Sequence, residues 1–120
     1  MTDYKFFVRP EDVPPFSPPG HSGTVNRRLI GEDVVGAKNL EVVLGELEVG
    51  GAAHPHKHED LEHAYYVLDG KCEIKVGEEI RIVTAGTMIF VPKNTEHYIK
   101  VLEKLRLLVF YAPPKYQPGE

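Results

Sequence analysis

The sequence has a single cysteine, Cys72, among its 120 residues, which excludes an internal disulfide and any cysteine-rich zinc module. Cys72 lies in a run of strand-forming residues, so we expect a buried and unreactive thiol. Basic clusters are lacking as well. Fourteen lysines and arginines stand against 18 acidic residues, and no basic cluster is longer than Arg27–Arg28. This charge balance argues against a surface that binds nucleic acid.

Long apolar segments are also absent. No run approaches the roughly 18 apolar residues that a membrane helix needs. The first twelve residues carry acidic side chains and no apolar core of secretory length. We therefore expect a cytoplasmic protein without a membrane partner.

The third absence is helical periodicity. No window of eleven or more residues keeps apolar positions at helical spacing, and 11 glycines and 10 prolines interrupt nearly every segment. What remains is a series of short runs of strand-forming residues. The clear runs are 40–49, 64–70, 71–76, 79–83, 87–92, 97–102 and 105–111, and the weaker ones are 4–8 and 24–30. Their spacing of about 8 to 12 residues predicts an all-β sandwich or barrel.

Glycines mark two predicted hairpins. Gly70 separates the runs 64–70 and 71–76, and Gly77 precedes the next run. A glycine between two short strands is typical of a tight turn, so we expect the chain to reverse at both positions.

The proline-rich segment 13–23 is a poor candidate for pairing inside a sheet, because proline lacks a backbone donor. We expect it to form an ordered arm over the barrel or to lead into an edge strand. The chain should then be one domain over residues 1–120, with an arm at 1–23, a barrel at 24–112 and a tail at 113–120.

Histidines are unevenly distributed. Four of the six lie within ten residues, at positions 54, 56, 58 and 63. In an extended strand residues two apart share a face, so the first three would face one side. Two adjacent imidazoles on that face can bind one metal ion, whereas the outer two of three lie roughly 13–14 Å apart. One of the three is therefore a bystander. Spacing alone leaves open which one it is, and the stretch also fits a solvent-facing loop.

The pattern around these histidines resembles the first of two short motifs of the cupin superfamily, whose members are small β-barrels. That motif has a glycine, five residues, a His-x-His pair, three or four residues, a glutamate, six residues and a glycine. The chain has Gly50, five residues, His56, Lys57, His58 and finally Gly70.

The second motif follows 15 residues later and ends on a further histidine. It has a glycine, five residues, a proline, any residue, a glycine, two residues, a histidine, three residues and an asparagine. The chain runs from Gly86 through Pro92 and Asn94 to His97 and Val101. Asn94 replaces a glycine at a turn that requires a positive φ, which asparagine tolerates best among the other residues. Val101 replaces the final asparagine, which is a structural position.

The resemblance implies a metal site with His56, His58, His63 and His97 as ligands. His63 stands at the glutamate position if four residues follow His58, and Glu62 stands there if three do. The six residues between His63 and Gly70 favour His63, because Glu62 would need seven. Aligning His54 and His56 as the pair would place Leu61 at the next ligand position, so His54 is expected at the rim, and His21 is expected to be exposed.

The resemblance further implies an antiparallel β-barrel of the double-stranded β-helix type and a homodimer to which the arm contributes. The cofactor would be one divalent transition metal, either Mn, Fe, Ni, Zn or Cu, since imidazole binds all of these. Its partner would be a small molecule with neighbouring oxygens, and the reaction an isomerase, lyase or dioxygenase type. Two alternatives remain, namely a non-catalytic binding or sensing module and a structural barrel without metal.

Three further residues are candidates for the pocket. Tyr65 is on the same predicted face as His63, as a pocket residue or as a buried structural tyrosine. Arg27 and Arg28 are able to hold a carboxylate or phosphate, although consecutive strand residues face opposite ways, so at most one faces inward. No general acid or base is evident, and the catalytic residues stay unassigned.

Overall fold

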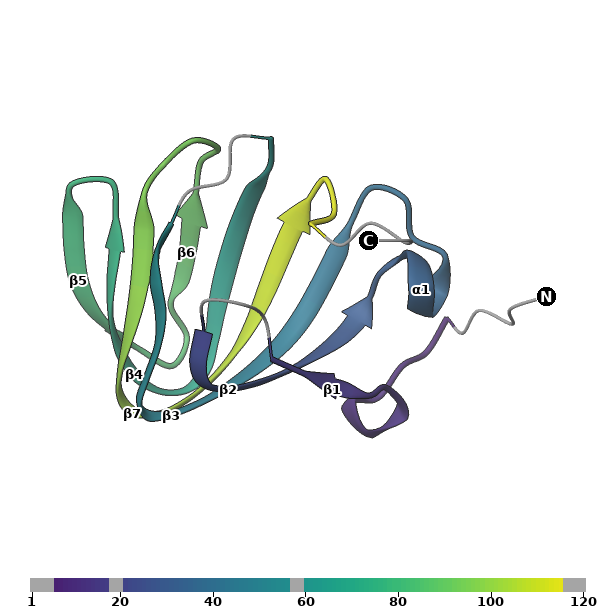
Figure 1. Cartoon of the computed structure of the whole chain (residues 1–120), viewed down its shortest axis with the longest axis horizontal. Helices are drawn as coiled ribbons and strands as arrows, with labels where there is room; N and C mark the ends of the chain where they lie inside the picture. The colour runs from purple at the N-terminus through teal and green to yellow at the C-terminus, as the bar shows by residue number, and fades with distance from the viewer. Residues whose placement is uncertain (1–5, 18–20, 57–59, 116–120) are drawn as a thin grey trace.

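The chain folds into a small antiparallel β-barrel (Figure 1). The structure is a computed structural model that describes residues 6–17, 21–56 and 60–115, with the backbone alone for 21, 22 and 52–56. Its strands are β1 (Pro15–Phe16), β2 (His21–Ile30), β3 (Glu41–His56), β4 (Glu62–Val76), β5 (Glu79–Thr84), β6 (Met88–Val91) and β7 (His97–Ala112). Two single-turn helices accompany them, η1 (Pro10–Asp12) and α1 (Glu32–Val35). Over the described ranges, no helix is long and apolar enough to cross a membrane.

Three long strands, β3, β4 and β7, each contribute to both sheets of the barrel. The pairing order is β1-β2-β3-β7-β4-β5, with β6 also paired to β4. The first half of β4 pairs with β6 and its second half with β5, while β7 follows β4 along both halves. In Figure 1 the long strands bend together along the lower edge of the view, so their halves belong to two facing sheets. The predicted fold class is therefore confirmed.

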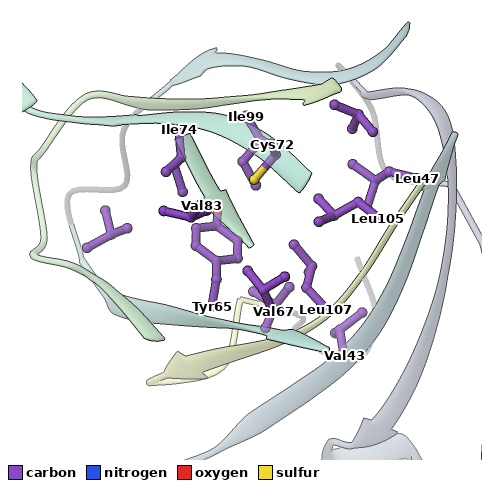
Figure 2. Packing of buried hydrophobic residues seen from close by; sticks show 13 residues of the cluster. Val43, Leu47, Tyr65, Val67, Cys72, Ile74, Val83, Ile99, Leu105 and Leu107 are labelled. Atoms are coloured by element: carbon purple, nitrogen blue, oxygen red, sulfur yellow. The ribbon is translucent and has the colours of Figure 1, made fainter. Parts of the chain in front are cut away.

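The interior is filled from both sheets by alternate residues of each strand (Figure 2). In β4 the buried positions are every second residue up to Val67 and again from Cys72 onward, as period-2 alternation requires. Val67 and Leu105 have no exposed surface. Burial of a side chain of this size contributes about 1.5–3 kcal/mol, so the apolar runs of the sequence account for the barrel interior.

The predicted hairpin at Gly70 is wrong, because β4 continues past this residue as one bent strand and the chain does not reverse there. Gly70 has a φ of +96°, and a Cβ atom there would lie 2.0 Å from the carbonyl oxygen of Lys104 on β7. The pairing register of β4 with β7 shifts on both sides of this residue. The glycine therefore allows two bent strands to approach closely at a corner. The runs 97–102 and 105–111 are likewise one strand, β7.

Of the other local predictions, those at Gly77 and Asn94 are confirmed and that of a strand at 4–8 is not. Val76 pairs with Glu79 across the two-residue turn at Gly77, which confirms that hairpin. Asn94 has a φ of +58°, which confirms the positive φ expected there. The predicted strand at 4–8 is wrong for its described part, since residues 6–8 are outside any strand. Phe6 and Phe7 are exposed.

The N-terminal arm is held to the barrel by Arg27. Its guanidinium donates to the carbonyl oxygens of Pro10 and Val13, at 3.2 and 2.8 Å. Pro15 and Phe16 form the two-residue strand β1 at the edge of β2, so part of the proline-rich segment is itself an edge strand. β2 begins at His21, three residues before the predicted start of the barrel.

Candidate metal centre

His97 begins β7, directly after the turn that contains Asn94. It is 1% exposed, and its Nδ1 lies 2.9 Å from the carbonyl oxygen of Thr95. A carbonyl oxygen only accepts, so Nδ1 carries the proton and donates this hydrogen bond. In the neutral ring the lone pair is then on Nε2. A backbone carbonyl that fixes one ring nitrogen is typical of a histidine that binds a metal through the other.

His63 lies on β4 beside His97. It is 3% exposed, and the centroids of the two imidazole rings are 4.5 Å apart, with the ring planes at 63°. The Nε2 of His63 is 3.0 Å from the hydroxyl oxygen of Tyr65. If Nε2 carries the proton and donates to this oxygen, the lone pair of His63 is on Nδ1. Two buried imidazoles from different strands therefore meet at one end of the barrel.

The pair His56 and His58 is only partly within the described structure. His56 is the last residue of β3, and its backbone is the register partner of His97. The β3–β7 register shifts between Ala53 and His56, so an irregularity in β3 precedes this position. His58 lies outside the described residues, as do the side chains of His54 and His21. The structure thus brings His63 and His97 together and places the backbone of His56 opposite His97.

The alternation along β4 bears on the choice between Glu62 and His63. His63 is buried and faces the interior, whereas Glu62 is exposed. The orientation follows the predicted parity, and His63 stays the predicted third ligand. Within the described residues (6–17, 21–56 and 60–115), no group of three His, Cys, Asp or Glu side chains lies close enough together to hold a metal ion. The two described imidazoles nevertheless fit a transition metal by donor type and burial.

One buried tyrosine, Tyr65, and one partly buried tyrosine, Tyr111, complete the polar surface beside His63. Tyr65 is 5% exposed, and the ring of Tyr111 lies 5.4 Å from that of His63, centroid to centroid. Burial raises the pKa of Tyr65 well above its usual value, and neighbouring Tyr111 and Cys72 add to this. Burial, together with the nearby Glu41, also raises the pKa of Tyr111. Both hydroxyls therefore stay protonated at neutral pH. Tyr65 was expected on this face. Tyr111 was not, although its parity with the inward residues of 105–111 is a usable signal.

A buried ion pair lies beyond Tyr111. Glu41 is 2% exposed and is the register partner of Tyr111. Its Oε2 accepts a hydrogen bond from Nε of Arg28 at 2.8 Å, and its Oε1 accepts one from the backbone N–H of Lys115 at 2.8 Å. The Arg28 guanidinium also stacks on the Phe16 ring, 4.7 Å from its centroid. Removing one partner of such a pair costs about 3–5 kcal/mol.

Both arginines of the sequence pair are therefore engaged within the chain. Arg28 binds Glu41, and Arg27 binds the arm. The register partner of Arg28 is the core residue Val43, whereas that of Arg27 is Leu44, so the two arginines face opposite ways as predicted. No sequence signal pointed to Glu41, because a single glutamate before an apolar strand is ordinary.

The fold and these residues define a class: a small antiparallel β-barrel with buried histidines at one end. A family model described as "Cupin domain" matches residues 43–111, more than half of the chain. The chain belongs to the cupin family.

Three similar proteins extend the comparison. The chain is 32% identical to an uncharacterised protein of Streptomyces coelicolor over 81 residues, which cover 65% of this chain and 74% of that protein. It is 28% identical to an L-ectoine synthase of Wolinella succinogenes, with 82% of this chain and 73% of the synthase covered. The structure is similar to that of the polyketide cyclase RemF of Streptomyces resistomycificus, with a TM-score of 0.75, 28% identity and 99% and 89% of the two chains covered. Two of these three relatives are named as enzymes.

Proposed function

We propose that the protein is a metal-dependent enzyme that acts on a small oxygenated molecule, with His56, His58, His63 and His97 as the metal ligands. The observation that carries the proposal is the pair of buried imidazoles, His63 and His97, with ring centroids 4.5 Å apart. Imidazole nitrogens are common ligands of divalent transition metals, so two imidazoles that meet in the barrel interior are suitable donors for such an ion. The names of the two enzyme relatives support a catalytic role over a purely structural one.

When bound, a divalent metal would supply a Lewis acid that polarises a carbonyl oxygen or, for a redox-active ion, a centre for oxidation. The residues of the chain orient the ligands and exclude water. The carbonyl oxygen of Thr95 fixes the tautomer and orientation of His97. The hydroxyl of Tyr65 orients the His63 ring through a hydrogen bond with its Nε2. The buried side chains of the core exclude water from the far side of the site.

The two tyrosines are suited to hydrogen bonding with a substrate oxygen. Because burial keeps the hydroxyls of Tyr65 and Tyr111 protonated, each is able to donate to a substrate oxygen on which negative charge develops. Such donors suit a substrate with neighbouring oxygens, such as a diketone, an enediol or a hydroxy acid. Isomerase, lyase and oxygenase reactions all act on molecules of this kind.

The proposal is tested by metal analysis of purified protein and its variants. We expect about one transition-metal ion per chain and at least a tenfold loss of affinity in His58→Ala, His63→Ala and His97→Ala, because each removes a ligand. His54→Ala, Glu62→Ala and His21→Ala are the matched controls and should retain the metal. The readout is elemental analysis by mass spectrometry, with equilibrium dialysis for affinity.

Two results would contradict the proposal. Wild-type protein that stays empty after growth in metal-supplemented medium would remove its basis. A larger loss of metal affinity in Glu62→Ala than in His63→Ala would instead make Glu62, and not His63, the third ligand. Turnover of a candidate diketone or hydroxy acid by the loaded protein then separates an enzyme from a module that only binds.

A further inference from the structure

A cavity of about 370 Å³ opens between β5 and β6. The two strands pair with different halves of β4, on opposite sides of its bend at Gly70. In Figure 1 both strands lie toward the left end of the barrel. The volume is within the range of small-molecule pockets, about 300–1,000 Å³.

The lining of this cavity is mainly apolar. Its inner wall consists of core residues or residues packed on the core, namely Ile74, Val76, Val83 and Ile89. Its rim includes Met88 and Phe90, which are 58% and 56% exposed. The charged lining residues, Glu79 and Arg81, are paired with each other, so their charges offset. The cavity therefore suits an apolar group and does not select for charge.

The cavity lies beside the candidate metal centre. Val76 of its inner wall is the register partner of His97 on β7. Ile89 of the same wall, on β6, is the register partner of Tyr65 on β4. The ring of Tyr65 points into the interior toward Val83, a third lining residue (Figure 2). Since register partners on antiparallel strands are direct neighbours, the inner wall is in contact with the histidine site from one side.

We infer that the substrate has an apolar body, aromatic or branched aliphatic, that occupies this cavity while its oxygenated end lies at the histidines. This inference rests on the proposed function and specifies the substrate class. An apolar body would gain affinity from the wall residues, and the polar end would reach the hydroxyl of Tyr65 and the rings of His63 and His97. A small sugar or short hydroxy acid would leave the cavity unfilled.

The test compares two probes with the same spacing of hydroxyl and carboxylate groups. 1-Hydroxy-2-naphthoate carries an apolar body, and 3-hydroxypropanoate carries none. Titration calorimetry on protein that retains its metal should give at least about tenfold tighter binding for the naphthoate. The double variant Met88→Glu, Phe90→Glu should lose about tenfold in naphthoate affinity and keep its affinity for 3-hydroxypropanoate.

The matched control is the double variant Ile80→Glu, Ile82→Glu. These two residues are similarly exposed, at 55% and 61%, and lie on β5 without lining the cavity. Unchanged binding of both probes by this control supports the inference. Equal loss in both double variants, or equal affinity of wild-type protein for both probes, would overturn it.

Two further measurements keep the outcomes distinct. Metal content is determined for the wild-type protein and for every variant. If wild-type protein without metal still binds the naphthoate through Met88 and Phe90, the proposed metal-dependent function is overturned, whereas binding of an apolar group in the cavity is supported. Molecular mass by light scattering is determined as well. A change of oligomeric mass in the Met88→Glu, Phe90→Glu variant would make the cavity rim an interface between copies of the chain and would overturn the inference.

Discussion

The tautomer of His97 is fixed by its immediate neighbours in the chain. Thr95, two residues before, accepts the Nδ1 proton, and Asn94 adopts the positive φ of the turn that leads to this geometry. The local sequence thus prepares one nitrogen of a buried ring for a ligand role. The Nε2 of His63 is hydrogen-bonded with the hydroxyl of Tyr65, again two residues away, and this contact orients the His63 ring. Both arrangements belong to single strands or turns, so they form with the local backbone.

Cys72 provides a prediction for a single residue. Burial raises the pKa of the Cys72 thiol from 9.0 to about 11. At pH 8 only about one thiol in a thousand is then ionised, so labelling by a disulfide reagent should be at least roughly 100-fold slower than in denaturant. Reaction at the rate of the unfolded chain would contradict the burial.

The same shift has a consequence for stability. The folded state holds the thiol proton more tightly than the unfolded state, so the contribution is complete below pH 9 and falls as the pH rises toward 11. The replacement Cys72→Val should reduce the loss of unfolding free energy between pH 9 and 11, as measured by denaturant titration.

Sequence reasoning at this scale succeeded where the pattern is local. The alternation of β4 gave the inward positions of His63 and Tyr65, and the turn gave the φ of Asn94. It failed for Glu41, whose partners Arg28 and Lys115 lie on other elements. Such a contact depends on the register of β2 against β3 and on the path of the chain after β7.

At the scale of elements, the corner of β4 is the decisive feature. The sequence predicts a turn at Gly70, because a glycine between two short strand-forming runs is typical of a hairpin. In the structure Gly70 has a positive φ, a conformation that glycine adopts readily. In a barrel the same conformation bends a strand at a bulge, and the partner strand then approaches too closely for any side chain. The strand-forming runs from residue 40 onward lie largely in strands, whereas the continuity of β4 and of β7 was missed and the run 4–8 is not a strand over its described part.

Two glycines allow this explanation to be checked. Gly70 and Gly86 have similar φ values, +96° and +90°, but a Cβ at Gly70 would meet the Lys104 carbonyl at 2.0 Å and one at Gly86 would meet nothing within 4 Å. Gly86→Ala should therefore cost only the backbone strain, about 1–3 kcal/mol of unfolding free energy. Gly70→Ala should cost more, because β4 and β7 must also separate.

Denaturant titration of both variants measures the difference. Equal destabilisation would mean that the close approach of β7 contributes nothing at Gly70. The control for overall integrity is the near-ultraviolet circular dichroism of the six tyrosines.

For the whole molecule, the two cupin-like motifs gave the fold class correctly, because they fix the ends of several strands and their order. Assembly is a separate question. The arm presents Phe6 and Phe7, which are 87% and 90% exposed, next to an apolar hollow lined in part by Val8, Leu29 and Val42. Exposed aromatic side chains beside an apolar hollow are typical of an interface with a partner.

We therefore expect a homodimer to which the arm contributes. The double variant Phe6→Ser, Phe7→Ser should weaken it at least tenfold, as measured by the concentration dependence of molecular mass in light scattering. The Ile80→Glu, Ile82→Glu variant is the control and should remain dimeric. A wild-type protein that is monomeric at all concentrations would contradict this prediction.

The three long strands also determine how the chain reaches its native state. β3, β4 and β7 each cross both sheets, and β7 contacts β3 and β4 along most of its length, so the great majority of contacts join residues far apart in sequence. A high contact order of this kind slows folding, because distant segments must meet before any local gain is realised. During synthesis on the ribosome, neither sheet of the barrel is therefore complete until β7 has left the exit tunnel and paired with β3 and β4.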